Sequence, residues 1–184
     1  NKGKHMKTKL NHPQLKIAAL SAMLLGTALS VPAYADTSSA NMAVTANIGM
    51  NCTISTTDIA FGGYDAIVTN ASVDLDAQGS VTATCTVGSA GSVIIGQGLG
   101  ASEGSTDADP VRRMQGPGEG DYLEYQVYSN DDRSAVWTNT VATGETYTAT
   151  GSAEVMPVYG RVAAGQTSVA EGSYSDTLIV TVNY

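Results

Sequence analysis

Beyond residue 35 the sequence contains no lysine and no histidine, because all five lysines and both histidines lie in residues 1–35. Without histidine, this part of the chain can build neither a Ser-His-Asp triad nor a histidine-ligated zinc or copper site. Four arginines then face 17 acidic residues, so residues 36–184 carry a formal charge of −13. A net field of this sign excludes attraction to nucleic acids or anionic membranes, and it favours solubility.

The sequence also lacks an apolar run long enough for a membrane-spanning helix. Its longest, residues 17–31, falls short of the ~20 residues that a bilayer requires and ends at Pro32. Lysines precede this run and an Ala-x-Ala pattern follows it at 33–35, which is typical of a secretion signal peptide. We therefore expect residues 1–35 to comprise five upstream residues before Met6 and a signal peptide. Its removal leaves 149 residues, one domain of ordinary size.

Cysteine is scarce, since only Cys52 and Cys85 are present. In an exported chain these two residues meet an oxidising compartment, where a disulfide between them is favoured. The bond closes a loop of about 34 residues, and restricting the unfolded chain in this way stabilises a fold by roughly 4 kcal/mol. We expect a Cys52–Cys85 disulfide.

No segment of residues 36–184 has the 3.6-residue periodicity of an amphipathic helix. Short runs that alternate or are rich in β-branched residues recur instead, separated by Gly, Ser, Asn and Asp. These runs are NCTISTTDIAFG, GSVTATCTV, GSVIIGQGL, DYLEYQVYS, SAVWTN, ETYTATGSAEVMPVYGRV and SYSDTLIVTVNY. Six or seven short strands with one inter-strand disulfide predict an all-β sandwich of immunoglobulin-like topology. The acidic, glycine-rich segment 98–121 is interpreted as a solvated loop.

Both ends of the chain that follows the signal have the pattern of amphipathic strands. Residues 41–50 alternate between apolar and polar side chains, and residues 178–184 do the same. The last strand has no following hairpin partner, and a long apolar edge of this kind normally needs a cover. We therefore expect a groove beside residues 174–184, one strand short, which residues 41–50 of a neighbouring copy have the length and alternation to fill. The alternative is that residues 41–50 form an ordinary first strand that pairs within its own domain.

Three other kinds of site were considered and are not favoured. Two acidic residues could form a glycosidase pair, but acidic residues in a chain of this charge are typical of a solvated surface. The segment DLDAQGS at 74–80 has the start of a calcium loop, yet Cys85 stands where the bidentate Glu is needed, so only a weaker surface calcium site stays open. Trp137 with nearby tyrosines could supply the aromatic platform of a lectin-like module. We expect neither an enzyme nor a cofactor.

A set of short elements follows a characteristic order along residues 36–184. They are the first cysteine after an N-terminal extension, DIAFGGYD at 58–65, VTATCTV at 81–87, RRM at 112–114, LEYQVYSND at 123–131 with Trp137 following, VYGRV at 158–162 and the ending GSYSDTLIVTVNY. In order and spacing these elements resemble the pilins of archaic chaperone–usher pili, which carry the spore coat protein U domain. The positions that carry the family pattern are Phe61, Gly62, Tyr64, Tyr159, Gly160, Gly172 and Tyr174.

The resemblance implies an incomplete immunoglobulin-like domain at residues 51–184 that lacks its last strand, preceded by a donor-strand extension at residues 36–50. It further implies delivery to the periplasm by a chaperone that lends a strand, and assembly at an outer-membrane usher, where the extension of the next subunit replaces the chaperone strand. The expected partners are other copies of this chain, the chaperone, the usher and a tip adhesin. The expected location is a cell-surface fibre that serves adhesion and biofilm growth. The alternative is a secreted lectin-like binding module or a spore or surface coat protein.

The residues expected to meet in such a fibre follow from the two alternating ends. The donor-strand candidates are Met42, Val44, Ala46 and Ile48. The acceptor-groove candidates are Ile54, Leu178, Val180, Val182 and Tyr184. The register of the donor strand stays open, because Ala46 offers little apolar area and Met50 could enter the groove in place of Met42.

Overall fold

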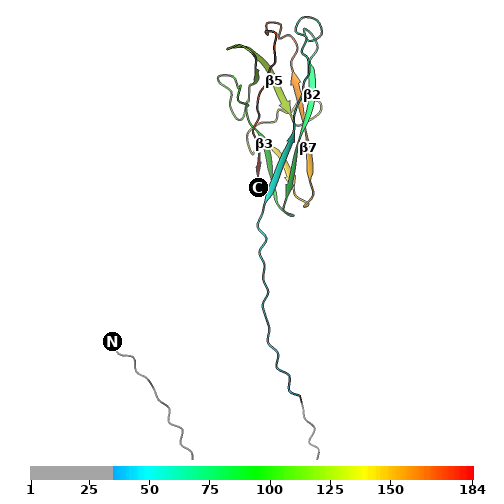
Figure 1. Cartoon of the computed structure of the whole chain (residues 1–184), viewed down its shortest axis with the longest axis vertical. Coiled ribbons are helices and arrows are strands. Elements are labelled where there is room, and N and C mark those ends of the chain that lie inside the picture. Colours follow the sequence, from blue (N-terminus) through cyan, green and yellow to red (C-terminus); the bar gives the residue numbers. More distant parts are fainter. Residues whose placement is uncertain (1–34) are drawn as a thin grey trace, which may run out of the picture. The chain divides into compact units, whose positions relative to one another are not determined.

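The computed structural model describes residues 35–184, and all regular structure in this range is β-strand. The predicted signal peptide and the upstream residues lie outside the described residues, apart from Ala35. Eight strands follow one another along the chain (Figure 1). They are β1 (Cys52–Thr57), β2 (Leu75–Cys85), β3 (Ala90–Ile95), β4 (Arg112–Gln115), β5 (Tyr122–Tyr128), β6 (Glu145–Thr148), β7 (Glu154–Val162) and β8 (Val180–Asn183). The expected all-β class is confirmed.

The strands form two antiparallel sheets. One sheet has the order β1-β2-β7-β5-β4, and the other has the order β6-β3-β8. The pairing of β1 with β2 aligns Cys52 with Cys85, and their sulfur atoms form a disulfide 2.08 Å long. Figure 1 shows that β1 begins at the same end of the domain at which β8 ends.

One hydrophobic core joins the inner faces of the two sheets. Period-2 alternation produces it: along β2 the buried residues are Val81, Ala83 and Cys85, and the residues between them are half-buried. The other sheet contributes Val93 and Ile95 from β3, which are 0% and 1% exposed. Buried side chains from β5, β6 and β7 complete the cluster: Leu123, Tyr125, Val127, Tyr147, Met156, Val158 and Val162. The domain is therefore a sandwich in which alternate residues point inward.

A buried arginine ties the two sheets together. Arg112 in β4 is 1% exposed, and its guanidinium donates hydrogen bonds to the carbonyl oxygens of Ile95 (2.9 Å), Gly96 (3.0 Å) and Trp137 (2.8 Å) and to the side chain of Gln126. Burial lowers the pKa of Arg112 to about 10, so the group stays charged at neutral pH. The Trp137 indole, also 1% exposed, donates to the carbonyl oxygen of Val93 at 2.9 Å. Backbone carbonyls of the second sheet are thereby satisfied by side chains from outside it.

Three expected elements differ from the structure. The segment 98–121 contains a strand, β4, and Arg113 anchors its first part by donating to the carbonyl oxygens of Gly100 and Ala101. The run SAVWTN forms only an isolated bridge between Val136 and Tyr128. The run at 145–162 divides into β6 and β7. In these three segments, the alternation of neighbouring residues did not predict where the strands begin and end.

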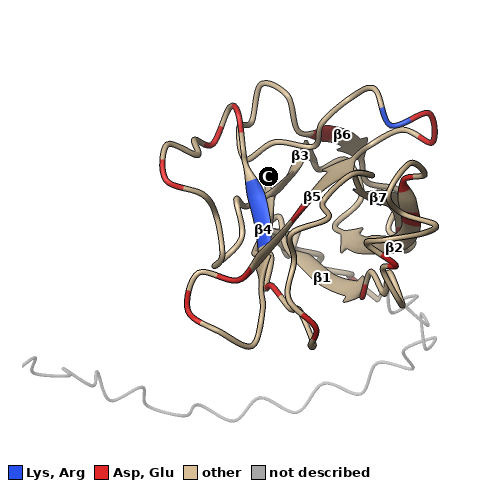
Figure 2. Ribbon diagram, turned by 90° about the horizontal axis from the view of Figure 1, so that it is seen from above, with Lys and Arg blue, Asp and Glu red and all other residues tan. Residues whose placement is uncertain are grey.

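The chain divides into two compact units, residues 1–44 and residues 45–184. The described part of the first unit, residues 35–44, contains no strand, and its side chains are exposed. In the second unit, twelve of the 16 acidic residues lie outside strands, as Figure 2 illustrates in red, whereas β4 carries the adjacent Arg112 and Arg113. Within the described range, no helical segment has the length and apolarity needed to span a bilayer.

Replacing both cysteines (Cys52→Ser with Cys85→Ser) is expected to lower the free energy of unfolding by roughly 4 kcal/mol, because the unfolded chain regains the freedom that the disulfide removes. Urea unfolding followed by tryptophan fluorescence measures this change through the buried Trp137. Reductant should lower the urea midpoint of the wild type to that of the double variant, and it should leave the midpoint of the double variant unchanged. An unchanged wild-type midpoint under reductant contradicts the prediction.

Candidate functional site: an open groove between two sheet edges

The inner face of β1 is uncovered. Ile54 and Thr56 are register partners of Ala83 and Val81 in β2, so all four side chains point into the sandwich. Ala83 and Val81 are 3% and 1% exposed, but Ile54 is 41% exposed and Thr56 is exposed as well. Since inward-pointing residues of a closed sandwich are buried, the sandwich is open along β1.

The opposite wall of this opening is formed by β8 and the segment that leads into it. Along residues 174–182, side chains alternate between half-buried and exposed positions. The half-buried ones are Tyr174, Asp176, Leu178, Val180 and Val182, and the exposed ones between them include Ile179, at 65%. Nine extended residues span about 30 Å, which sets the length of the wall.

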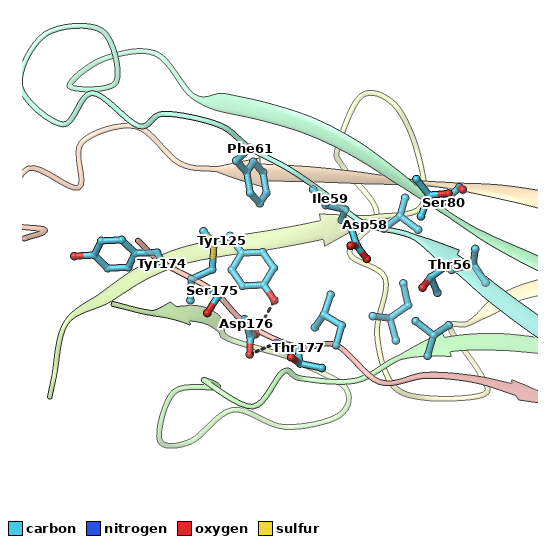
Figure 3. A pocket seen from close by; sticks show the side chains of 17 residues that line it. Thr56, Asp58, Ile59, Phe61, Ser80, Tyr125, Tyr174, Ser175, Asp176 and Thr177 are labelled. Atoms are coloured by element: carbon cyan, nitrogen blue, oxygen red, sulfur yellow. Dashed lines mark hydrogen bonds between the residues drawn. The ribbon is translucent and has the colours of Figure 1, made fainter. Parts of the chain in front are cut away.

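A groove of ≈ 540 Å³ lies between the two walls (Figure 3). The residues that line it come from the β1 side, the β8 side and the core beneath: Thr56, Thr57, Asp58, Ile59, Phe61, Ser80, Val81, Ile95, Met114, Tyr125, Val158, Tyr174, Ser175, Asp176, Thr177, Leu178 and Val180. Its floor includes Val81, Ile95 and Val158, which are core residues of both sheets. An occupant of the groove therefore completes the hydrophobic core itself.

Both walls also present unpaired backbone. Within the described chain, β1 pairs with β2 alone and β8 pairs with β3 alone, so each has one free edge facing the groove. Free edges are where an additional strand can form main-chain hydrogen bonds. The opening thus combines an apolar floor with two rows of available donors and acceptors, which is the chemistry that receives a β-strand rather than a small polar ligand.

The groove wall has one polar inward position, Asp176, between Tyr174 and Leu178. The hydroxyl of Tyr125 donates to Asp176 at 2.7 Å (Figure 3), and the backbone nitrogen of Gly100 donates to the same carboxylate at 3.0 Å. Burial raises the pKa of the Tyr125 phenol, and its hydrogen bond to Asp176 raises it further. Tyr125 is therefore a fixed donor that keeps the carboxylate of Asp176 in place at the groove wall.

The expected groove residues occupy different positions along this opening. Leu178 and Val180 line the groove, and Val182 packs against the core cluster beyond it. Ile54 points inward from β1 without touching the lined volume, and Tyr184 is 53% exposed at the last residue. The opening extends instead toward Tyr174 and Phe61.

Sequence reasoning omitted two inward positions of the wall. Alternation continues from Leu178 back to Asp176 and Tyr174, and it would have indicated both of them. Asp176 was not considered because a carboxylate is an unusual side chain on a buried face. The floor residues Met114 and Tyr125 come from strands distant in sequence, and no local signal indicates their place in the groove.

The expected donor-strand residues are exposed. Residues 41–50 contain no strand, and Met42, Val44 and Ile48 are 87%, 88% and 83% exposed, whereas Met50 is 62% exposed. Ala46 is exposed as well. The segment therefore has the apolar spacing of a β-strand, but its apolar side chains are exposed to solvent.

A family model described as the Spore Coat Protein U domain matches residues 38–181. The chain belongs to the Spore Coat Protein U domain family. Protein U of Myxococcus xanthus is 38% identical over 181 residues, which cover 95% of this chain and 100% of that protein. Among solved structures, the chain resembles one chain of the CsuC–CsuE chaperone–tip adhesion subunit pre-assembly complex from the archaic chaperone–usher Csu pili of Acinetobacter baumannii, with a TM-score of 0.50 and 18% identity. The match covers 73% of this chain and 40% of the solved one, and it shows a shared fold. The family and the fold are those of structural proteins rather than of enzymes.

The positions expected to carry the family pattern make close contacts in the domain. The hydroxyl of Tyr64 donates to the carbonyl oxygen of Ala163 at 3.0 Å and accepts from the backbone nitrogen of Gln166 at 3.1 Å. Gly160 has no room for a side chain, because a Cβ there would stand 2.8 Å from the ring of Phe61.

The other pattern positions act locally. Gly62 adopts a φ of 77°, a left-handed conformation that favours glycine. A Cβ at Gly172 would lie 2.6 Å from Pro117, and the Tyr174 hydroxyl donates to the carbonyl oxygen of Ala170 at 2.9 Å. The Arg133 guanidinium lies 5.6 Å from the ring centroid of Tyr159. These contacts set turns and close approaches around the two walls.

The two other sites considered from the sequence have structural uses in this Spore Coat Protein U domain. Arg161 binds the carboxylate of Asp76 through two hydrogen bonds of 2.8 and 2.9 Å, and it lowers the pKa of Asp76. Asp74 also lies 3.3 Å from Arg161, and the part of the chain that the structure describes contains no cluster of three or more potential metal ligands. Trp137 is buried, so it forms no part of a surface platform.

Gly160→Ala is expected to destabilise the domain by about 1–3 kcal/mol, because the added methyl group forces Phe61 and Ile59 away from the groove end. Chemical unfolding measures the loss. Gly63→Ala is the matched control, since a Cβ at Gly63 meets nothing within 4 Å. Equal stability of the two variants would show that the close contact at Gly160 has no energetic weight.

Proposed function

We propose that this protein is the repeating structural subunit of a chaperone–usher pilus, in which residues 42–48 of one copy fill the groove of the next. One observation carries the proposal: the same chain combines an apolar groove between two free sheet edges with an exposed segment whose apolar side chains have the period of a strand. The segment 41–50 has the length of the wall at residues 174–182, and its apolar side chains have the same period of two. The occupant of the groove is a second copy of this chain.

The energetics favour an association that hardly reverses. Burying Met42, Val44 and Ile48 contributes ~1.5 to 3 kcal/mol each. Pairing of the inserted strand with the free edges of β1 and β8 adds about ten backbone hydrogen bonds, each worth ~1 kcal/mol. Ordering a free segment costs about 1–2 kcal/mol per residue and offsets much of this gain. The balance favours binding because the donor also buries the floor of the neighbour's core, which is exposed while the groove is empty.

The geometry of the contact leads to a filament. Donor and groove are different surfaces of the chain, so the contact is head-to-tail and leaves one donor and one groove free after every addition. Such contacts extend without limit unless a rotation closes them into a ring. The likeness in fold to a subunit of archaic chaperone–usher pili supports this form of assembly.

Partners and location follow from the same proposal. An empty groove exposes a hydrophobic core, so the subunit needs a chaperone that covers the groove until a second copy replaces it. We propose a periplasmic chaperone, an outer-membrane usher and a tip adhesin as partners, and a fibre on the cell surface that serves adhesion and biofilm growth. The solved relative is itself part of a complex of a chaperone with a tip adhesion subunit.

A second candidate function is a surface or spore coat built from the same strand-exchange contact. The 38% identity to Protein U of Myxococcus xanthus and the description of the family favour it. Electron microscopy of material sheared from cells distinguishes the two: thin fibres support the pilus, and sheets or an amorphous layer support the coat.

Ile48→Asp is expected to reduce polymer formation at least a hundredfold, because it places a charge where the donor strand meets an apolar floor. Light scattering of the purified chain measures the polymer. Asn47→Asp introduces the same charge at the neighbouring, opposite-facing position and should polymerise like the wild type. Wild-type polymer from Ile48→Asp would refute the assignment of the donor face.

Leu178→Asp is expected to block the groove in the same way, and Ile179→Asp is its control on the exposed face. Neither Ile48→Asp nor Leu178→Asp should polymerise alone. Mixed together they should form a dimer and nothing larger, because the first retains its groove and the second retains its donor strand. Light scattering measures the mass of this dimer, and circular dichroism shows separately whether Leu178→Asp is folded. Absence of the dimer, with both variants folded by circular dichroism, contradicts the proposed pairing.

A further inference from the structure

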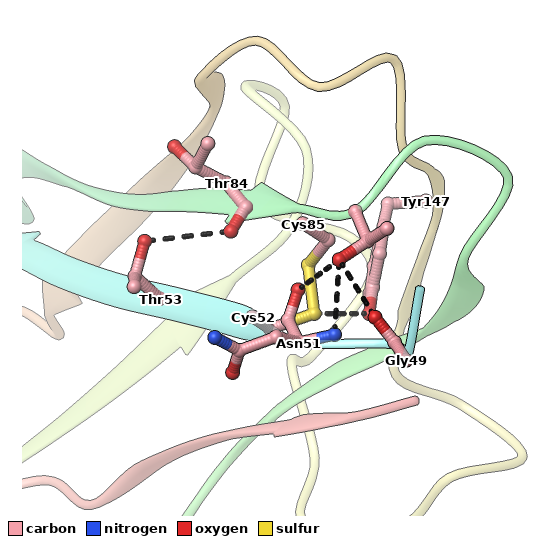
Figure 4. Close-up of a disulfide and its surroundings, with 8 residues drawn as sticks. Gly49, Asn51, Cys52, Thr53, Thr84, Cys85 and Tyr147 are labelled. Carbon is pink, nitrogen blue, oxygen red and sulfur yellow. Dashed lines mark hydrogen bonds between the residues drawn. A yellow bond between two sulfur atoms is a disulfide. The ribbon is translucent and has the colours of Figure 1, made fainter. Parts of the chain in front are cut away.

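Hydrogen bonding between the two neighbouring chain segments continues beyond the β1–β2 pairing, at Asn51 and Thr86. The backbone nitrogen of Thr86 donates to the carbonyl oxygen of Asn51 at 2.9 Å, and the backbone nitrogen of Asn51 donates to Oγ1 of Thr86 at 3.1 Å. The Thr86 hydroxyl lies 3.3 Å from the carbonyl oxygen of Asn51 and 3.5 Å from that of Gly49. Figure 4 shows these contacts beside the disulfide. One threonine side chain thus holds residues 49–51 in line with β1.

Tethering makes such a contact important. A segment joined to its own groove has an effective concentration in the millimolar range, above that of any second copy at micromolar concentration. An extension that is free to turn back would therefore complete its own domain before it met a neighbour. A chain that polymerises through its extension, as proposed above, must prevent this closure.

Strand parity excludes the simplest closure. The inward residues of β1 are Cys52, Ile54 and Thr56, because their partners in β2 are buried. In a hairpin with a two-residue turn at Gly49 and Met50, each even-numbered residue of β1 pairs with an odd-numbered residue of the extension. The residues that would then point inward are Asn41, Ala43, Thr45 and Asn47, and the apolar set would point to solvent. This closure buries the wrong face.

For the extension to bury its apolar residues in its own groove, the turn before β1 must contain an odd number of residues. The shortest such turns have three residues and run through 48–50 or 49–51. Both include Gly49 and Met50, and both bend the backbone that Thr86 holds extended at Gly49 and Asn51. Closure through either of these turns must therefore break the contacts of Thr86.

We propose that Thr86 is a positioning residue that keeps the extension out of its own groove and so reserves the groove for a second copy. The inference rests on the proposed function, because it concerns which copy supplies the strand. The disulfide next to Thr86 fixes the base of the extension, and Thr86 sets its direction.

Thr86→Val tests the proposal, because valine keeps the shape of the threonine side chain and lacks its hydroxyl. The variant is made in the full-length chain and expressed for export. Loss of one exposed hydrogen bond of ordinary strength should raise the fraction of self-completed monomer about fivefold. Thr84→Val is the matched control, since Thr84 lies two residues before Thr86, is half-buried like it, and has no hydrogen bond from its hydroxyl to the extension. A second variant inserts Gly-Asn-Gly between Met50 and Asn51, which lets the chain turn without disturbing Thr86. It should be mostly monomeric.

Two readouts distinguish self-completion from failure to fold. Light scattering gives the mass of the particle, and a labelled peptide of residues 38–50 reports an open groove. A self-completed monomer is folded and does not bind the peptide. If both variants polymerise as the wild type does, the role of Thr86 is refuted and strand exchange is unaffected. If excess peptide does not stop wild-type polymerisation, the proposed function itself fails.

Discussion

The structure depends on one unmet requirement, which is that the inner faces of β1 and β8 need a strand between them. Ile54 and Thr56 point inward from β1 and are exposed, while their partners in β2 are among the most buried residues of the domain. The floor between the walls consists of core residues such as Val81, Ile95 and Val158. A groove of this kind is a defect in the core, so its occupant contributes to folding as well as to binding.

An open sandwich must keep its shape without the missing strand, and polar groups placed inside the fold do this. The Arg112 guanidinium holds three carbonyl oxygens at the end of the second sheet, and the Trp137 indole holds a fourth. Tyr125 and the Gly100 backbone hold Asp176 in the groove wall. The disulfide ties β1 to β2 at the near end. These fixed points preorganise the walls, which reduces the ordering cost when a strand enters.

The extension and the groove wall both alternate with a period of two residues, and the apolar side chains of both are incompletely buried. The apolar residues of 41–50 are exposed, and the apolar residues of 174–182 are only half-buried. Parity and the contact of Thr86 with residues 49–51 oppose the closure of one upon the other within a chain. Under the proposed assembly, this resistance to closure favours pairing between copies over pairing within one chain.

The sequence alone determined what is local. Period-2 alternation is a property of neighbouring residues, so it identified the all-β class and the inward set Leu178, Val180 and Val182, and it predicts a strand-like extension at 41–50; the two cysteines of an exported chain indicated the disulfide. Only the tertiary structure decided which strands lie at the edges, and therefore where the groove is open and that it reaches Phe61 and Tyr174. It also placed Arg112 and Asp176 inside, where their polar side chains contradict the local pattern. The physical reason is that edge position and the burial of a polar group depend on partners distant in sequence, and periodicity carries no information about them.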